Sequence, residues 1–258
     1  MAMDRDKLAR LFDLTGRVAI VTGGTRGIGR AVAEGFVCAN AKVVVASRKA
    51  DACAETQAHL ESLGGDVSAI PTHMGDTAAL HSLVDRTIER FGRLDIVVNN
   101  AANALTMPIG QFSEDAWEKS LGVNLRGPVF LVEAALPHLK ASGNASIINV
   151  ISAGAFLFSA GTAMYSAAKA GLMAMTRAQA ASLAQFGIRS NALAPGTVDT
   201  DMVRNNGPEA AQRMANAAFM RRAAHVDEMV GPALFLASDA SSFMTGQVIL
   251  ADGGLTPH

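Results

Sequence analysis

The chain has 258 residues, of which 50% are hydrophobic and 17% are charged, a balance typical of a folded protein that buries a sizeable core without disulfides or metal. Its 22 basic and 23 acidic side chains leave a net charge of -1, so we expect no general attraction to nucleic acid or to an anionic membrane. The cysteines, Cys38 and Cys53, lack the spacing of metal ligands, and no metal is expected.

The amino-terminal segment, MAMDRDKLARLFDL, carries charges along its length and lacks the apolar run of a signal peptide. No later stretch approaches the roughly 18 uninterrupted apolar residues of a transmembrane helix. Together with the low cysteine content, these features predict a cytoplasmic protein with no membrane partner.

Short apolar runs alternate with longer helix-like segments along the whole sequence. Several runs, such as VVVA, DIVV and SIINV, are apolar on both faces, as parallel strands buried between two helix layers are. The expected strands span residues 18–22, 42–46, 67–71, 94–99, 146–151, 189–193 and 248–250. This β-α-β alternation predicts an α/β fold in which one doubly wound parallel sheet carries helices on both faces. We find no linker or repeat, and expect a single domain over residues 1–258.

Three segments between the strands have a recognisable character. Residues 76–91 have apolar side chains at three- and four-residue spacing, and Asp76 is a plausible N-cap. Long helices are expected near residues 113–140 and 163–186. Residues 197–222 are rich in Asn, Ala, Met and Arg, and indicate a mobile substrate loop with short helices.

The first strand runs into a glycine-rich turn that a helical pattern follows at once. Gly23, Gly27 and Gly29 allow a tight turn, a close approach of the backbone to a pyrophosphate, and close packing of helix on sheet. The helix N-terminus then offers free N–H groups to the phosphate. No GK[ST] follows, so the turn is not a P-loop. The segment predicts a dinucleotide site.

The end of the second strand indicates which dinucleotide binds. An acid at this position would bind the adenosine ribose, but here the strand ends in Ser47 and Arg48. Arg26 lies inside the glycine turn, and guanidinium groups suit a 2′-phosphate. We therefore expect NADP(H) to be preferred, with NAD(H) possible.

Residues suited to acid–base chemistry follow. Tyr165, the single tyrosine, and Lys169 are four residues apart and share one helix face. Ser152 ends the fifth expected strand, where strand ends of such a sheet meet the binding crevice. Asn124 lies in the helical segment 113–140.

With these motifs in place, the chain resembles the short-chain dehydrogenase/reductase superfamily, in its short single-domain branch, over essentially its whole length. The matching pieces are TGGTRGIG at 22–29, NNAA at 99–102, Asn124, Ser152, YSAAK at 165–169, Pro195-Gly196 followed by Thr200, and Gly246 with Asp252-Gly253-Gly254. The resemblance implies a Rossmann-type fold and a hydride transfer between the cofactor and a carbonyl/alcohol pair.

The resemblance also implies a catalytic tetrad of Asn124, Ser152, Tyr165 and Lys169. Tyr165 acts as the general acid/base, and a lysine ammonium nearby lowers the pKa of a phenol that ordinarily titrates near ~10. Lys169 also binds the nicotinamide ribose, Ser152 polarises the substrate oxygen, and Asn124 holds a water that links Lys169 to solvent.

Further cofactor contacts carry over from the same resemblance. Besides the glycines, Arg26, Ser47, Arg48, Tyr165 and Lys169, they are Thr25, Ile28, His73, Met74, Asn100, Ala101, Pro195, Gly196, Val198 and Thr200. Two positions depart from the family pattern. Ala102 replaces a glycine, and His73 replaces the aspartate that faces the adenine, so His73 is either a base contact or a loop histidine.

The expected substrate is a small-molecule carbonyl or alcohol. Residues 153–158, Met107 and the segment 202–220 are candidate lining and suggest an apolar, adaptable site. Four arginines in the loop leave an anionic substrate open, and they are Arg204, Arg213, Arg221 and Arg222.

Other functions stay open on the sequence. The main alternatives to a carbonyl reductase are an NAD-preferring alcohol dehydrogenase and a non-catalytic NADP(H) sensor. An enoyl reductase has a similar fold, but its Tyr and Lys are more than four residues apart. The resemblance also implies a homotetramer, or a dimer, built through helices 113–140 and 163–186 and the last strand.

Overall fold

A computed structural model describes residues 3–157 and 161–256. Its strands form one parallel sheet in the order β3-β2-β1-β4-β5-β6-β7. They are β1 (Val18–Thr22), β2 (Lys42–Ser47), β3 (Val67–Pro71), β4 (Ile96–Asn99), β5 (Ser146–Val150), β6 (Arg189–Pro195) and β7 (Val248–Ala251). The prediction of a doubly wound, seven-stranded sheet is confirmed, with strand ends that differ from the expected ones by at most two residues.

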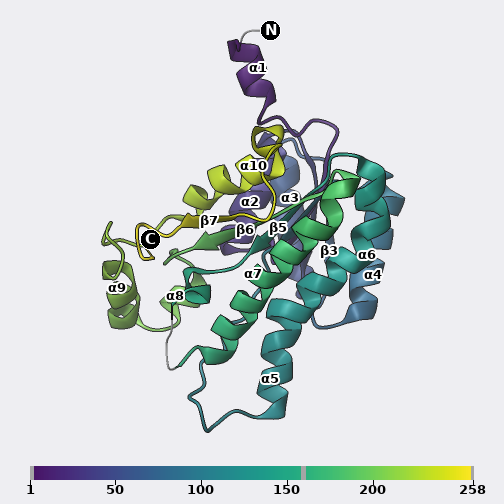
Figure 1. Ribbon diagram of the computed structural model, residues 1–258. Helices are drawn as coiled ribbons and strands as arrows, with labels where there is room; N and C mark the ends of the chain where they lie inside the picture. The colour runs from purple at the N-terminus through teal and green to yellow at the C-terminus, as the bar shows by residue number, and fades with distance from the viewer. Residues whose placement is uncertain (1–2, 158–160, 257–258) are drawn as a thin grey trace.

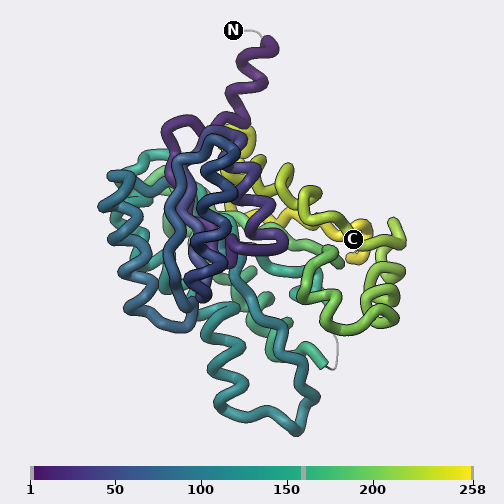
Figure 2. Tube along the Cα trace, turned by 180° about the vertical axis from the view of Figure 1, so that it is seen from behind, coloured from purple at the N-terminus to yellow at the C-terminus, as the bar shows by residue number. Residues whose placement is uncertain are grey.

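Helices cover both faces of the sheet (Figure 1). One layer holds α2 (Gly27–Cys38), α3 (Ala50–Ser62) and α10 (Val230–Ala237), and the other holds α4 (Thr77–Phe91), α6 (Gly127–Ser142) and α7 (Ala163–Leu183). The remaining helices are α1 (Arg5–Arg10), α5 (Glu114–Leu121), α8 (Asp201–Arg204) and α9 (Pro208–Asn216). Figure 2 shows the α2 and α3 layer from the opposite side.

The two cores follow from the strand period of two. Val43 and Val45 of β2 face α2 and α10, whereas Val44 between them faces α4 and α6. Phe36 of α2 and Leu131 of α6 are fully buried, one in each core. Both faces of the central strands are therefore covered, which explains why the strands are apolar without alternation.

Helix α4 begins and ends where the sequence indicates. The Asp76 carboxylate accepts hydrogen bonds from the amides of Ala78 and Ala79 at 3.0 and 3.2 Å. The helix ends at Gly92, whose φ of 76° lies in the left-handed region that favours glycine.

The expected single helix over 113–140 is wrong in one respect. A five-residue π-helical turn, Gly122–Arg126, separates α5 from α6, which then continues to Ser142. Pro128 has no amide hydrogen, so it cannot make the α-helical bond to the Asn124 carbonyl. Gly127 lies so close to the loop between β3 and α4 that a Cβ there would be 2.2 Å from the Met74 carbonyl oxygen. The turn places Asn124 under the site.

Residues 197–222 contain the two short helices α8 and α9, as expected. Within residues 3–157 and 161–256, no helix is both long enough and apolar enough to span a membrane.

A buried carboxylate joins the amino ends of the central strands. Asp95, 1% exposed, accepts from the Val18 amide at 2.9 Å and from both Arg93 nitrogens, Nε and Nη2, at 2.8 and 2.7 Å. We predict that Asp95→Ala lowers the free energy of unfolding in urea by about 2–4 kcal/mol, because these donors lose their acceptor. Asp115→Ala, which removes an exposed partner of Lys119, should cost less than about 1 kcal/mol. Equal losses in the two variants would contradict the role of Asp95.

Candidate active site

A cleft of about 1110 Å³ lies outside the carboxyl ends of the strands. Strand order reverses between β1 and β4, the place where doubly wound sheets bind ligands. The volume of the cleft is slightly above the usual range for ligand pockets, about 300–1000 Å³, so the cleft has room for more than one small molecule. Most residues predicted for the site line it: Gly23, Thr25, Arg26, Gly27, Ile28, Ser47, Arg48, Met74, Asn100, Ala101, Ser152, Tyr165, Lys169, Pro195, Gly196, Val198 and Thr200.

The glycine turn forms a tight cradle at the N-terminus of α2. Gly23 has a φ of +63°, and a Cβ on Gly29 would lie 2.3 Å from the Gly23 carbonyl oxygen and from the Asn100 Nδ2. Gly29 itself lies behind the lining. The Thr25 hydroxyl donates to the Ser47 Oγ at 3.0 Å, which ties the turn to the end of β2. No larger residue fits at position 29 without moving the backbone of the turn.

Two arginines stand at the same end of the cleft. Arg26 Nη1 lies 3.5 Å from an Asp201 carboxylate oxygen, and both side chains are largely exposed. Arg48 is exposed beyond β2, and no acidic partner for it occurs among the described residues. The two guanidinium groups are therefore accessible to an anion at this end.

The structure does not bring His73 into the cleft. Its side chain is exposed, and its Nδ1 accepts from the Gly75 amide at 3.1 Å within its own loop. The neighbours Thr72 and Met74 are buried and line the cleft in its place. Sequence reasoning missed Thr72, which the alternation of side chains beyond β3 turns inward.

Lys169 and Tyr165 lie together on α7, beside the end of β5. Lys169 is 1% exposed, and its Nζ donates to the Val150 carbonyl at 2.7 Å. The same Nζ lies 5.7 Å from the centre of the Tyr165 ring. Ser152 follows β5 and accepts from the Gly154 amide at 3.0 Å. Ser152, Tyr165 and Lys169 thus line one short stretch of the cleft.

Burial shifts both ionisable groups of this cluster. Desolvation raises the pKa of Tyr165, and hydrogen bonding with Ser152 opposes the rise. Desolvation also lowers the pKa of Lys169 from 10.5 to about 8. Lys169 therefore remains mainly protonated at neutral pH and holds a positive charge beside the phenol.

Asn124 is fully buried and lies behind the cleft. Its Nδ2 donates to the carbonyl and the Oδ1 of Asn103, both at 2.9 Å, and to the Ser120 carbonyl at 3.0 Å. Its Oδ1 accepts from the Asn103 amide at 3.1 Å. The Asn124 side chain therefore fixes the loop after β4 to the π-helical turn. Sequence reasoning missed Asn103, because nothing local in the sequence pairs the two asparagines.

Apolar side chains form one wall of the cleft. Leu157, Met202, Met214 and Leu255 line it, whereas Met107 does not and Phe156 packs with the core beside α7. Of the expected lining residues 153–158, Phe158 lies outside the described residues.

The turn after β7 holds Leu255 in this wall. The Asp252 carboxylate accepts from the amides of Gly254 and Thr256 at 2.9 and 2.8 Å. The Met220 amide donates to the Gly253 carbonyl at 3.0 Å, so the turn also packs on residues 197–222. Sequence reasoning did not place Leu255 at the site.

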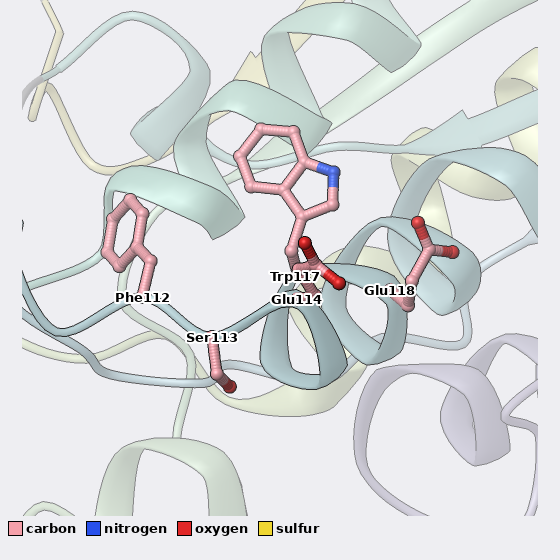
Figure 3. Close-up of a pocket in the computed structure, with 5 residues that line it drawn as sticks. All are labelled: Phe112, Ser113, Glu114, Trp117 and Glu118. Carbon is pink, nitrogen blue, oxygen red and sulfur yellow. The ribbon is translucent and has the colours of Figure 1, made fainter.

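A second hollow, of about 330 Å³, lies at the amino end of α5 (Figure 3). Phe112, Ser113, Glu114, Trp117 and Glu118 line it. Ser113 is engaged as the N-cap of α5. None of the residues predicted for the site lines this hollow, so the large cleft is the candidate active site.

Comparisons with known proteins agree with this geometry. The family model described as Enoyl-(Acyl carrier protein) reductase matches residues 23–256. The short chain dehydrogenase/reductase astE of Aspergillus oryzae is 39% identical over 252 residues, 95% of this chain and 97% of that protein. The chain belongs to the short-chain dehydrogenase/reductase family, whose members are oxidoreductases acting on CH–OH and C=O groups with NAD(P).

Solved structures are similar over nearly the whole chain. A gluconate 5-dehydrogenase from Burkholderia cenocepacia, in complex with NADP and tartrate, has a TM-score of 0.92 at 33% identity and covers 97% of this chain and 99% of its own. A 3-oxoacyl (acyl-carrier-protein) reductase from Agrobacterium tumefaciens C58, with NADP bound, has a TM-score of 0.91 at 33% identity and covers 98% and 100%. The family resemblance of the sequence and its Rossmann-type fold are confirmed.

The lowered pKa of Lys169 gives a testable pH dependence. Between about pH 8 and 10.5 the unfolded chain binds more protons than the native one, so this group's effect on stability becomes more favourable as pH rises. The slope reaches at most about 1.4 kcal/mol per pH unit. We predict that wild type gains stability relative to Lys169→Met when urea unfolding is measured at increasing pH through the lower part of this window. Tyr165, whose pKa is raised from 10.0, affects the pH dependence of stability only above pH 10.0. A flat or falling difference would contradict the burial effect.

Proposed function

We propose that this protein is an NADP(H)-dependent oxidoreductase that moves a hydride between the nicotinamide and a carbonyl/secondary alcohol pair, with Tyr165 as general acid/base. The observation that carries the proposal is the shared cleft. Ser152, Tyr165 and Lys169 line the same cavity as the glycine cradle and its two arginines. The four-residue spacing of Tyr165 and Lys169 favours a carbonyl over an enoyl substrate.

The residues present fit the proposed cofactor. The glycine cradle suits a pyrophosphate because Gly23 and Gly29 let the turn pack tightly against Asn100, which brings the N-terminus of α2 to the cleft. Arg26 and Arg48 are accessible to a 2′-phosphate, and no acid ends β2 to bind a ribose in its place. Relatives solved with NADP support this choice. Met74 and Ala101 are in reach of the adenine end, and Pro195, Gly196, Val198 and Thr200 line the path toward the nicotinamide.

The residues of the chain supply the proton chemistry. Bound NADPH supplies the hydride to the carbonyl carbon. Tyr165 donates its phenolic proton to the carbonyl oxygen, the alcohol forms, and the phenolate regains a proton from solvent. In oxidation, the phenolate takes the proton of the alcohol. The protonated Lys169 stabilises the phenolate, since an ammonium nearby favours the charged form of tyrosine.

Ser152 and Asn124 complete the tetrad in different ways. The Ser152 hydroxyl, at the end of β5, hydrogen-bonds the substrate oxygen and orients it toward Tyr165. Asn124 has its side-chain amide engaged with Asn103 and Ser120, so its backbone carbonyl, which Pro128 cannot engage, is the group to hold the water of the proton route. Asn124 is therefore a positioning residue.

Replacement of the phenol tests the catalytic role. We predict that Tyr165→Phe lowers kcat for carbonyl reduction by about 10³-fold, the scale of general acid–base catalysis, while NADPH affinity stays within about threefold. Initial rates and NADPH fluorescence titration measure the two quantities. A variant that keeps its turnover would exclude Tyr165 as the acid/base. If neither wild type nor variant turns over and both bind NADPH, the sensor is the better reading.

Nucleotide titrations test the cofactor preference. We predict that NADPH binds at least about tenfold more tightly than NADH, roughly 1.4 kcal/mol, and that Arg48→Ala removes most of this preference. Lys49→Ala removes the neighbouring positive charge, which lies outside the cleft, and should leave the ratio unchanged. NADH binding as tight as NADPH in the wild type would favour the NAD-preferring dehydrogenase.

The proposal includes a homo-oligomer, a tetramer or a dimer. Outward positions of α7, such as Ala167, Ala174 and Ala178, are exposed and small, which permits another helix to approach closely. Strand β7 lies at the edge of the sheet and is only half-buried. Both surfaces are those on which the sequence resemblance places subunit contacts.

A further inference from the structure

The sequence leaves open whether the substrate is charged. The side chains that line the cleft beyond Tyr165 indicate which charge the substrate can carry. The apolar side chains there are Leu157, Met202, Val203, Met214, Ala217 and Leu255. The polar ones are neutral amides and hydroxyls, among them Asn103, Asn205 and Ser166. We call this region the substrate end.

The positively charged side chains of the cleft either lie outside the substrate end or already bond another group of the protein. Among the described residues they are Arg26, Arg48 and Lys169. The two arginines stand at the glycine cradle, where the proposed 2′-phosphate takes them. Lys169 is buried and donates to the Val150 carbonyl behind Tyr165. None is available to an anionic group at the substrate end.

The arginines of the segment 197–222 do not supply a cation either. Arg204 binds both oxygens of Asp199, at 2.7 and 2.9 Å, and Arg222 binds both oxygens of Glu228, at 2.7 and 2.8 Å. Arg213 lies 3.7 Å from Glu209 on the same helix. Arg221 is exposed, and none of the four lines the cleft.

An anionic substrate would therefore lose hydration at the substrate end without gaining a charged partner, which is unfavourable. Arginine and lysine are the side chains favoured for direct contact with carboxylate or phosphate. The acidic side chain in the described lining, Asp201, lies 3.5 Å from Arg26 on the cradle side and offers an anion no attraction. Methionine and leucine side chains instead suit alkyl and aryl groups of varied shape.

Resting on the function proposed above, we infer that the reacting carbonyl belongs to an uncharged molecule with an alkyl or aryl substituent. The substituent packs on Met202, Met214 and Leu255. The side-chain amide of Asn205, which lines the substrate end, suits a neutral polar group such as an ester or an amide. A free carboxylate or phosphate on the same skeleton is disfavoured.

Matched pairs of substrates test this inference. Ethyl 3-oxobutanoate is compared with 3-oxobutanoate, and methyl 4-acetylbenzoate with 4-acetylbenzoate, by NADPH oxidation at neutral pH with the wild-type protein. We expect kcat/KM to be at least about 100-fold higher for each ester, equivalent to about 2.7 kcal/mol. Carboxylates reduced as well as the esters would overturn the inference and leave the proposed function standing.

A charge placed in the wall tests the cause. Met214→Lys puts an ammonium at the substrate end, and we expect it to raise kcat/KM for the carboxylates at least about tenfold and to lower it for the esters. Gln212→Lys makes the same charge change on α9 outside the cleft and should leave the ester-to-carboxylate ratio unchanged. Equal effects of the two variants would show that net charge, and not the lining, sets the preference.

A binding measurement separates this inference from the proposed function. If no pair is reduced although NADPH binds, the proposed function has failed. The melting temperature of the NADP⁺ complex is then measured with each compound. A rise with the esters alone supports an uncharged ligand. A rise with the carboxylates, or with neither, overturns it.

Discussion

The burial of one ammonium group organises the reactive part of this molecule. Lys169 reaches from α7 to the carbonyl at the end of β5, and this hydrogen bond at 2.7 Å fixes the helix against the sheet where the strands end. The same contact sets the position of Tyr165, one helical turn away, relative to Ser152, which follows β5 two residues later. Burying Lys169, which is only 1% exposed, costs free energy of solvation. In return, the ammonium group is held in a fixed position beside the Tyr165 phenol.

The rest of the cleft is arranged around this point by the order of the strands. The glycine cradle follows β1, Arg48 follows β2, and the loop with Asn100 and Asn103 follows β4. Because all strands run in one direction, their carboxyl ends meet at one edge, and residues more than 100 positions apart share a cavity. The sheet is thus a rigid frame, and α7 together with the loops beyond the strands carries the side chains that line the cleft.

The fold and most of the cleft were predictable from the sequence, for identifiable reasons. Apolar runs such as VVVA are typical of buried strands. The glycine turn is recognisable because its backbone packs too closely against neighbouring atoms for a Cβ to fit at Gly29. The π-helical turn was missed because an extra residue in one turn leaves the apolar period of the segment almost unchanged. His73 was left open because its outcome depends on a local hydrogen bond to Gly75. The pairing of Asn103 with Asn124 was missed because it depends on tertiary packing alone.

The turn after β7 and the segment 197–222 share a boundary as well as a cavity. Met220 donates to the Gly253 carbonyl, and the Phe219 ring packs so closely on Gly254 that a Cβ there would lie 2.8 Å from it. Neither segment contains a member of the proposed tetrad. Under the proposed function, the lining of the cleft can therefore change during evolution while the tetrad stays constant, but the two segments must change together, since a larger side chain on one side requires space on the other.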